Sequence, residues 1–260
     1  MNITTIELGA WLGSIWWPFL RIGSAFVMLP LFGDGYLPVW VRSLLALLMT
    51  VILYPIIAAP IQVDPISTGA LVIAFEQVLF GVFFGLIVHM LTAVFGLIGQ
   101  IISMQMGLSM SIMNDPSNGQ SHLVLSRMLI ILSTLMFLIL DGHLVVMAIL
   151  IDSFSIWPVG QSLSIQSIGI IIKLFGWMFT AAIALSLPAI IAMLAVNFAF
   201  GVMNRAAPSL NVFALGFPMT MILGLFSLFL AINGIQTRYI DYLMEIFEVL
   251  TAFVHGGEYV

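Results

Sequence analysis

The side chains that could do acid–base or nucleophilic chemistry are few and poorly spaced for it. Asp141 and His143 are two residues apart, which points them away from each other on a helix. Glu76 and His89 are separated by about 220° around an ideal helix, so they cannot form one relay. No Walker A, G-x-S-x-G or H-E-x-x-H pattern occurs, and the absence of cysteine excludes thiolate sites. The sequence therefore predicts no catalytic residue, metal site or cofactor.

A second group of charged side chains interrupts apolar segments. An unpaired cation in mid-membrane costs at least about 2.5 kcal/mol, so we expect each to face a partner or a wet cavity. Asp34 and Glu76 are the nearest acidic residues in the sequence that could pair with Arg21 and Arg42. These charges either pack against other subunits or form a functional site. The set is Arg21, Arg42, Glu76, Arg127 and Arg205.

The stretch from Gly96 to Gln120 lies between long apolar runs yet has a single charge, Asp115. Pro116 removes a backbone donor and disfavours helix at Asp115. We interpret the stretch as an irregular segment inside a membrane assembly, where flexible methionines fill changing gaps. The alternative is an ordinary connecting loop with methionines packed in a core. The methionines are Met104, Met106, Met110 and Met113.

The composition is that of an integral membrane protein. Hydrophobic residues make up 62% of the chain and charged residues 7%, against about 45–50% and about 25% in soluble domains. The net charge of -5, with only six basic residues along the chain, gives the phosphate backbone of nucleic acid nothing to bind, so nucleic acid is excluded as a partner.

Six hydrophobic segments are expected to form long, partly broken helices in hairpins. The third is too long for one ordinary span, and Asp141-Gly142-His143 interrupts the fourth. Glycines at 81, 85, 96 and 99 form a small-residue stripe that predicts close packing against another helix. The segments are Leu8–Leu31, Val39–Ile61, Ile66–Ile102, Leu123–Ile151, Ile168–Phe200 and Val212–Ile235.

The tail from Gln236 to Val254 is predicted to be an amphipathic helix. Asp241, Glu245 and Glu248 form an acidic face, whereas helices on anionic lipid carry Lys and Arg there. The acidic face therefore favours a protein partner over lipid. The expected apolar face is Ile240, Leu243, Phe247, Leu250 and Val254.

Short motifs in order along nearly the whole chain resemble one family. The chain opens with Arg21-x-Gly-x-x-Phe-x-x-x-Pro30-x-Phe-Gly33 and Pro38-x-x-x-Arg42. Further motifs are Glu76-x-x-x-x-Gly81-x-x-x-Gly85, Gln105-Met-Gly107-Leu-Ser, Asp115-Pro116, Gly142-His143, Ser153-x-x-x-x-Pro158-x-Gly160 and Asn204-Arg205-x-x-Pro208-x-x-Asn211-Val-Phe. Together they are similar to the FliR family, the inner-membrane export-gate proteins of flagellar and related type III secretion systems.

The resemblance implies a non-enzymatic gate component, multi-pass in the bacterial inner membrane and part of the flagellar basal body. It implies one subunit over residues 1–260 that fuses FliP-like and FliQ-like parts, without placing their boundary. Expected partners are FliP-like, FliQ-like, FlhB-like and FlhA-like proteins, unfolded secreted proteins and membrane lipid. The expected pore plug consists of Met104, Gln105, Met106, Gly107, Met110, Met113, Asn114, Asp115 and Pro116.

Two other classes of function remain open from the residues alone. A secondary transporter or ion channel would use Arg21, Glu76 and Arg127 as a midplane site. An intramembrane enzyme ranks lowest, because no nucleophile and base are paired.

Overall fold

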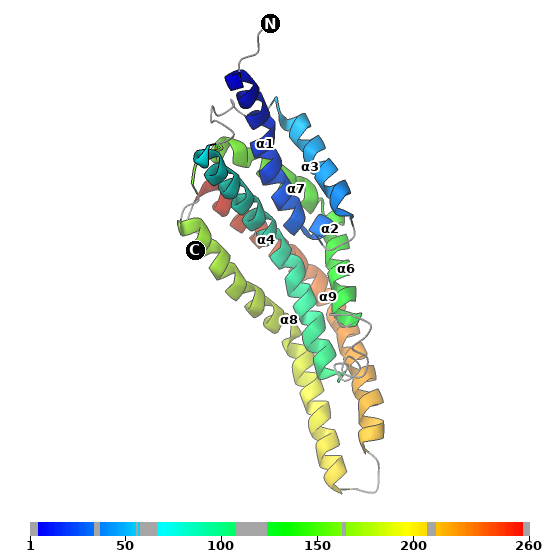
Figure 1. Ribbon diagram of the computed structural model, residues 1–260. Coiled ribbons are helices and arrows are strands. Elements are labelled where there is room, and N and C mark those ends of the chain that lie inside the picture. The colour runs from blue at the N-terminus through cyan, green and yellow to red at the C-terminus, as the bar shows by residue number, and fades with distance from the viewer. Residues whose placement is uncertain are drawn as a thin grey trace. The chain divides into compact units, whose positions relative to one another are not determined.

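The computed structural model describes residues 5–33, 37–55, 57, 67–107, 124–162, 165–206 and 212–256. Every labelled element in these ranges is a helix (Figure 1). Each of the six expected segments is mostly helical in its described part, and the all-α membrane fold is confirmed. The helices are α1 Thr5–Met28, α2 Pro30–Gly33, α3 Val39–Leu53, α4 Thr68–Gln105, α6 Val124–Ile139, α7 Gly142–Ile156, α8 Ile165–Ala206 and α9 Val212–His255.

Two of the described helices are apolar and long enough to cross a membrane, with mean hydropathies of 2.4 and 2.3. They cover Thr68–Gln105 and Gln166–Ala206, and the number rises to four if each of two bent helix pairs is one span. One such pair is α6 and α7, which meet at 69°. Asp141 lies at this bend with φ 55°, so the predicted break in the fourth segment is confirmed.

Two expected boundaries need correction. Gly96–Gln105 is not irregular, because it forms the last turns of α4, a continuous helix of 38 residues and roughly 57 Å. The second segment is shorter than predicted. Helix α3 ends at Leu53, since Pro55 has no N–H to continue the hydrogen-bond ladder, and Tyr54 and Pro55 form a turn.

The chain folds into two compact units whose segments alternate along the sequence. Unit 1 comprises Met1–Met90, Phe137–Phe175 and Met244–Val260, and unit 2 comprises Leu91–Met136 and Gly176–Leu243. The division into FliP-like and FliQ-like parts stays a prediction.

An aromatic cluster lies in the core of unit 1, where α1 also packs beside α3 (Figure 1). The Phe80 ring of α4 lies 5.6 Å from the Trp157 ring, which follows α7, and 5.2 Å from the Phe253 ring of α9. This core joins three segments that are distant in the sequence.

A second aromatic contact joins α4 to α9 within unit 2. The Phe95 ring of α4 lies 5.2 Å from the Tyr239 ring of α9. The Tyr239 hydroxyl donates a 2.8 Å hydrogen bond to the Ser133 carbonyl of α6. Tyr239 therefore connects three helices with its buried polar group satisfied.

The C-terminal part of α9 is amphipathic, as predicted, with Asp241 and Glu248 exposed. One residue of the predicted apolar face is misplaced. Ile240 is 42% exposed, because the buried stripe passes through its neighbour Tyr239. The buried residues of this stripe are Tyr239, Leu243, Ile246, Val249, Leu250, Phe253 and Val254.

Candidate functional site

The side chain of Arg21 is buried among neutral hydrogen-bond acceptors in unit 1, with 1% of its surface exposed. Nε donates to Gln77 Oε1 at 2.7 Å, and Nη2 donates to the Trp157 carbonyl at 2.9 Å. Nη1 donates to the carbonyl and hydroxyl oxygens of Ser153 at 3.2 and 3.3 Å. A single guanidinium therefore ties α1 to α4 and to the C-terminal end of α7.

Two aromatic rings complete the enclosure of Arg21. Its guanidinium carbon lies 4.5 Å from the Phe80 ring centre and 4.4 Å from that of Phe154. Desolvated cation–π contacts of this kind contribute about 2 kcal/mol. The rings and oxygens together offset the cost of removing the cation from water.

The acidic partner expected for Arg21 is not Glu76. Among the described residues, no carboxylate lies within ion-pair distance of Arg21, and the neighbouring amide of Gln77 takes that place. Asp34, the other candidate, lies outside the described residues. Sequence reasoning missed Gln77, Ser153 and Trp157 as a set. The available signal was that Gln77 is an amide in an otherwise apolar run.

The other charges predicted to act together are divided between the units. Arg42 and Glu76 belong to unit 1 with Arg21, whereas Arg127 and Arg205 belong to unit 2 and are exposed. Arg42 donates to the Leu37 carbonyl at 3.5 Å. Within the described ranges, no interaction joins Arg21 to Glu76, so a shared charged site receives no support.

The glycine stripe of α4 makes the predicted close contacts. In unit 1, a Cβ at Gly85 would lie 2.6 Å from the Ala25 carbonyl oxygen of α1. In unit 2, a Cβ at Gly99 would lie 2.7 Å from the Ser126 backbone nitrogen of α6. The Ser126 hydroxyl also donates to the Gly96 carbonyl at 2.7 Å. Small residues thus let α4 pack closely against α1 within unit 1 and against α6 within unit 2.

Replacing Gly81 with alanine should force α1 and α4 apart. The new Cβ would lie 2.9 Å from the Ala25 backbone nitrogen and nearer still to the Arg21 carbonyl oxygen. Overpacking of this kind costs about 1–3 kcal/mol, so thermal unfolding in detergent should begin at a lower temperature. Gly176→Ala is the matched control, since a Cβ there meets nothing within 4 Å. Equal stability of the two variants would contradict the predicted clash.

The described beginning of the methionine-rich segment belongs to unit 2. Met106 is 1% exposed, and a Cβ at Gly224 of α9 would lie 2.8 Å from its sulfur. The Met106 carbonyl accepts a 3.4 Å hydrogen bond from Thr220. Met104, in contrast, is 58% exposed. Met106 therefore anchors the entry to the segment.

Gly107 lies two residues after the end of α4 and is in the left-handed region, with φ 78°. Glycine adopts this conformation without steric cost, so the chain can change direction there. Gln105 is the last residue of the helix and is half-buried. The remaining predicted plug residues, Met110, Met113, Asn114, Asp115 and Pro116, lie outside the described residues.

Comparison with known proteins decides the family. The sequence model of the bacterial export proteins, family 1, matches residues 12–246. The chain belongs to this family. The predicted FliR membership is also confirmed, and this family member is a membrane component of bacterial flagellar-type export.

Individual relatives match over most of their length. The chain is 31% identical to the flagellar biosynthetic protein FliR of Escherichia coli (strain K12), covering 98% of this chain and 97% of the relative. It is 32% identical to that of Pectobacterium carotovorum subsp. carotovorum, covering 96% of each. It is 30% identical to that of Bacillus subtilis (strain 168), covering 77% and 79%.

Proposed function

We propose that this chain is a non-enzymatic subunit of the flagellar protein export gate. With FliP-like and FliQ-like subunits it forms the channel through which unfolded flagellar proteins leave the cytoplasm. FlhB-like and FlhA-like components contact that gate, which lies in the inner membrane within the flagellar basal body. Family membership supports the class of function, and the surface of α8 supports an assembly.

The observation that carries the proposal is the apolar stripe of α8, which is longer than a bilayer is thick. It extends over roughly 52 Å, against a hydrocarbon thickness of about 30 Å. Even at a tilt of about 40°, the upper end of the observed range, it would rise roughly 40 Å. Its exposed members are Ile168, Ile172, Phe175, Phe179, Ile183, Leu187, Ile191, Leu194, Phe198, Val202 and Met203.

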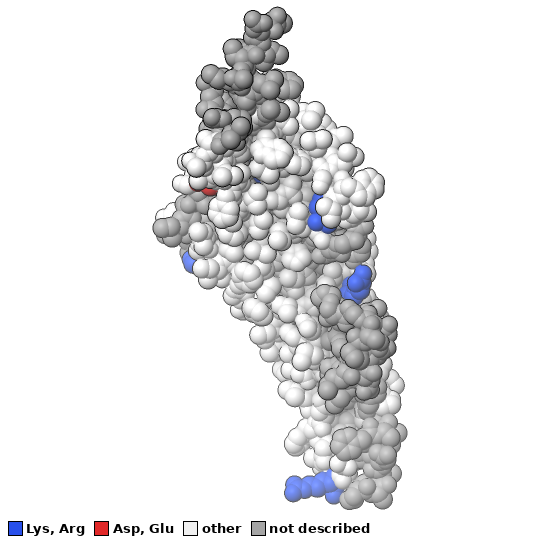
Figure 2. Space-filling view, in the orientation of Figure 1, with Lys and Arg blue, Asp and Glu red and all other residues white. Residues whose placement is uncertain are grey.

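The hydrocarbon layer is too thin to cover the whole stripe. Without another cover, the apolar side chains at its ends would be exposed to water. Contiguous exposed apolar surface outside a membrane marks a protein interface. Figure 2 shows how sparse charge is on one face: isolated Lys or Arg patches and very little Asp or Glu among the described residues. We assign the covering of the α8 stripe to the FliP-like and FliQ-like subunits.

The test is the composition of the particle extracted from its native membrane. After gentle detergent extraction, mass measurement should find this chain bound to unlike small membrane subunits. Expressed without them, the chain should aggregate or be degraded, because the α8 stripe would be uncovered. A stable monomer or homo-oligomer in both preparations would contradict the proposal and favour a carrier.

A further inference from the structure

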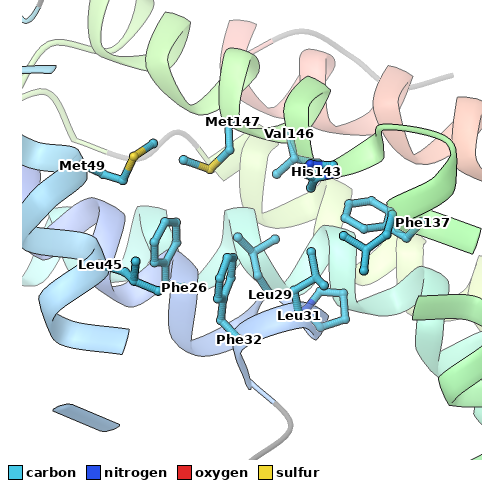
Figure 3. A pocket seen from close by; sticks show the side chains of 12 residues that line it. Phe26, Leu29, Leu31, Phe32, Leu45, Met49, Phe137, His143, Val146 and Met147 are labelled. Atoms are coloured by element: carbon cyan, nitrogen blue, oxygen red, sulfur yellow. The ribbon is translucent and has the colours of Figure 1, made fainter. Parts of the chain in front are cut away.

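An apolar cavity of about 360 Å³ opens in unit 1 beside the bend between α6 and α7 (Figure 3). Phe26 of α1, Leu29 between α1 and α2, and Phe32 of α2 line one wall, facing Met147 of α7. Leu45 and Met49 of α3 close another side. The surface presented to the cavity is entirely apolar, so His143 contributes carbon atoms to it.

The size and chemistry of this cavity suit a hydrocarbon chain. Its volume lies within the range of about 300–1,000 Å³ that is typical of ligand pockets. Water needs at least two polar partners in a cavity, and these walls offer none. In a chain of membrane helices, the abundant apolar molecule at such an opening is a lipid acyl chain.

A cation lies on the same face of α3 as this cavity. Arg42 precedes Leu45 by three residues and Met49 by seven, which places the three on one side of the helix. The side chain of Arg42 is part-exposed, and its Nη2 makes a long 3.5 Å hydrogen bond to the Leu37 carbonyl. The distance along the axis from Arg42 to Met49 is roughly 10 Å. A part-exposed guanidinium thus lies about one helical turn from the residues of α3 that line the cavity.

We propose that this part of unit 1 binds one anionic phospholipid, with its phosphate on Arg42 and an acyl chain in the cavity. Arginine suits a phosphate because its planar donors match the oxygens in a bidentate arrangement. A zwitterionic lipid could fill the cavity equally well, but its headgroup amine would oppose the guanidinium. An apolar side chain of a protein partner could also fill the cavity, but it would bring no anionic group to the Arg42 guanidinium.

The test uses a phosphatidylglycerol that carries a photoreactive diazirine in one acyl chain. The full chain, extracted with its copurifying subunits, is irradiated with this probe, and the labelled peptides are mapped. Labels should fall on the segments that contain Leu45, Met49 and Met147. Arg42→Gln should lower this labelling roughly tenfold or more, the effect of losing a charge-assisted hydrogen bond. A phosphatidylcholine probe should label weakly and respond little to Arg42→Gln.

Three variants separate the site from general effects. Arg127→Gln removes an exposed cation outside the cavity lining and should leave labelling unchanged. Met147→Trp should abolish labelling by filling the cavity, and Leu45→Phe should reduce it with less strain. Asp34→Asn removes the nearest acid in the sequence and should not lower labelling.

Several outcomes would overturn the proposal. One is equal labelling by the two probes, and another is equal loss in Arg42→Gln and Arg127→Gln. Labels confined to other segments, in an extract that keeps its subunits, would mean that protein fills the cavity.

Discussion

Replacing Arg21 with alanine should lower the free energy of unfolding by about 3–5 kcal/mol. The change leaves a void between the rings of Phe80 and Phe154, and large-to-small core changes alone cost about 2–5 kcal/mol. It also strands Gln77 Oε1 and the Trp157 carbonyl without their donor. Urea or thermal unfolding of the full chain in detergent measures the loss.

Two further substitutions test whether geometry or charge matters at this position. Arg21→Lys keeps the charge but cannot reach Gln77, Ser153 and Trp157 together, so it should lose most of the same stability. Arg21→Met fills part of the volume without burying a charge and should be milder than alanine. Arg127→Ala, at an exposed position, is the control and should change stability little. An Arg21→Lys protein as stable as the parent would show that charge alone suffices.

Shortening the segment from Met104 to Gln120 should make the assembled gate leak small ions. A channel wide enough for an unfolded chain must be sealed at rest, and a ring of fixed charges would hold water in it. Uncharged, flexible methionines exclude water when packed and still yield to varied side chains. Changing Met104, Met106, Met110 and Met113 together to alanine should raise ion conductance well above the sealed background, measured in planar bilayers or proteoliposomes.

The position of Met106 supplies a control for this prediction. Met106 is packed against Gly224, whereas Met104 is exposed, so Met106→Ala alone tests anchoring and Met104→Ala alone tests sealing. Native mass measurement should confirm that every variant remains assembled. If the variant with all four methionines changed to alanine is assembled and conducts no more ions than the parent, the methionines only pack in the core and the seal lies elsewhere.

The sequence alone determined the features that depend on composition and local pattern. A chain that is 62% hydrophobic must satisfy its backbone hydrogen bonds internally, which requires helices once strand patterning is absent. The break at Asp141-Gly142-His143 and the turn at Gly107 follow from local backbone preferences. The spacing of Gly81, Gly85, Gly96 and Gly99 predicted a close helix contact, although not with which helix. The ordered motifs placed the chain in its family.

The sequence misjudged boundaries where local polarity and tertiary packing disagree. The expected helical segment and the expected irregular stretch overlapped at Gly96 and Gly99, and the structure places both of them, and Ser103, buried in α4. Contact with α6 stabilises the helix there, and the Ser126 hydroxyl bonds the Gly96 carbonyl. Helical propensity was overridden by packing, as it commonly is.

Only the tertiary structure decided which residues meet. Arg21 is 56 residues from Gln77 and 132 from Ser153, and it finds them because α1, α4 and α7 turn particular faces inward. A single sequence gives the periodicity of each helix but not the rotation of one helix against another. The acceptors of the buried Arg21, the apolar cavity lined by α1, α3 and α7 and the alternation of the chain between two units all depend on that rotation.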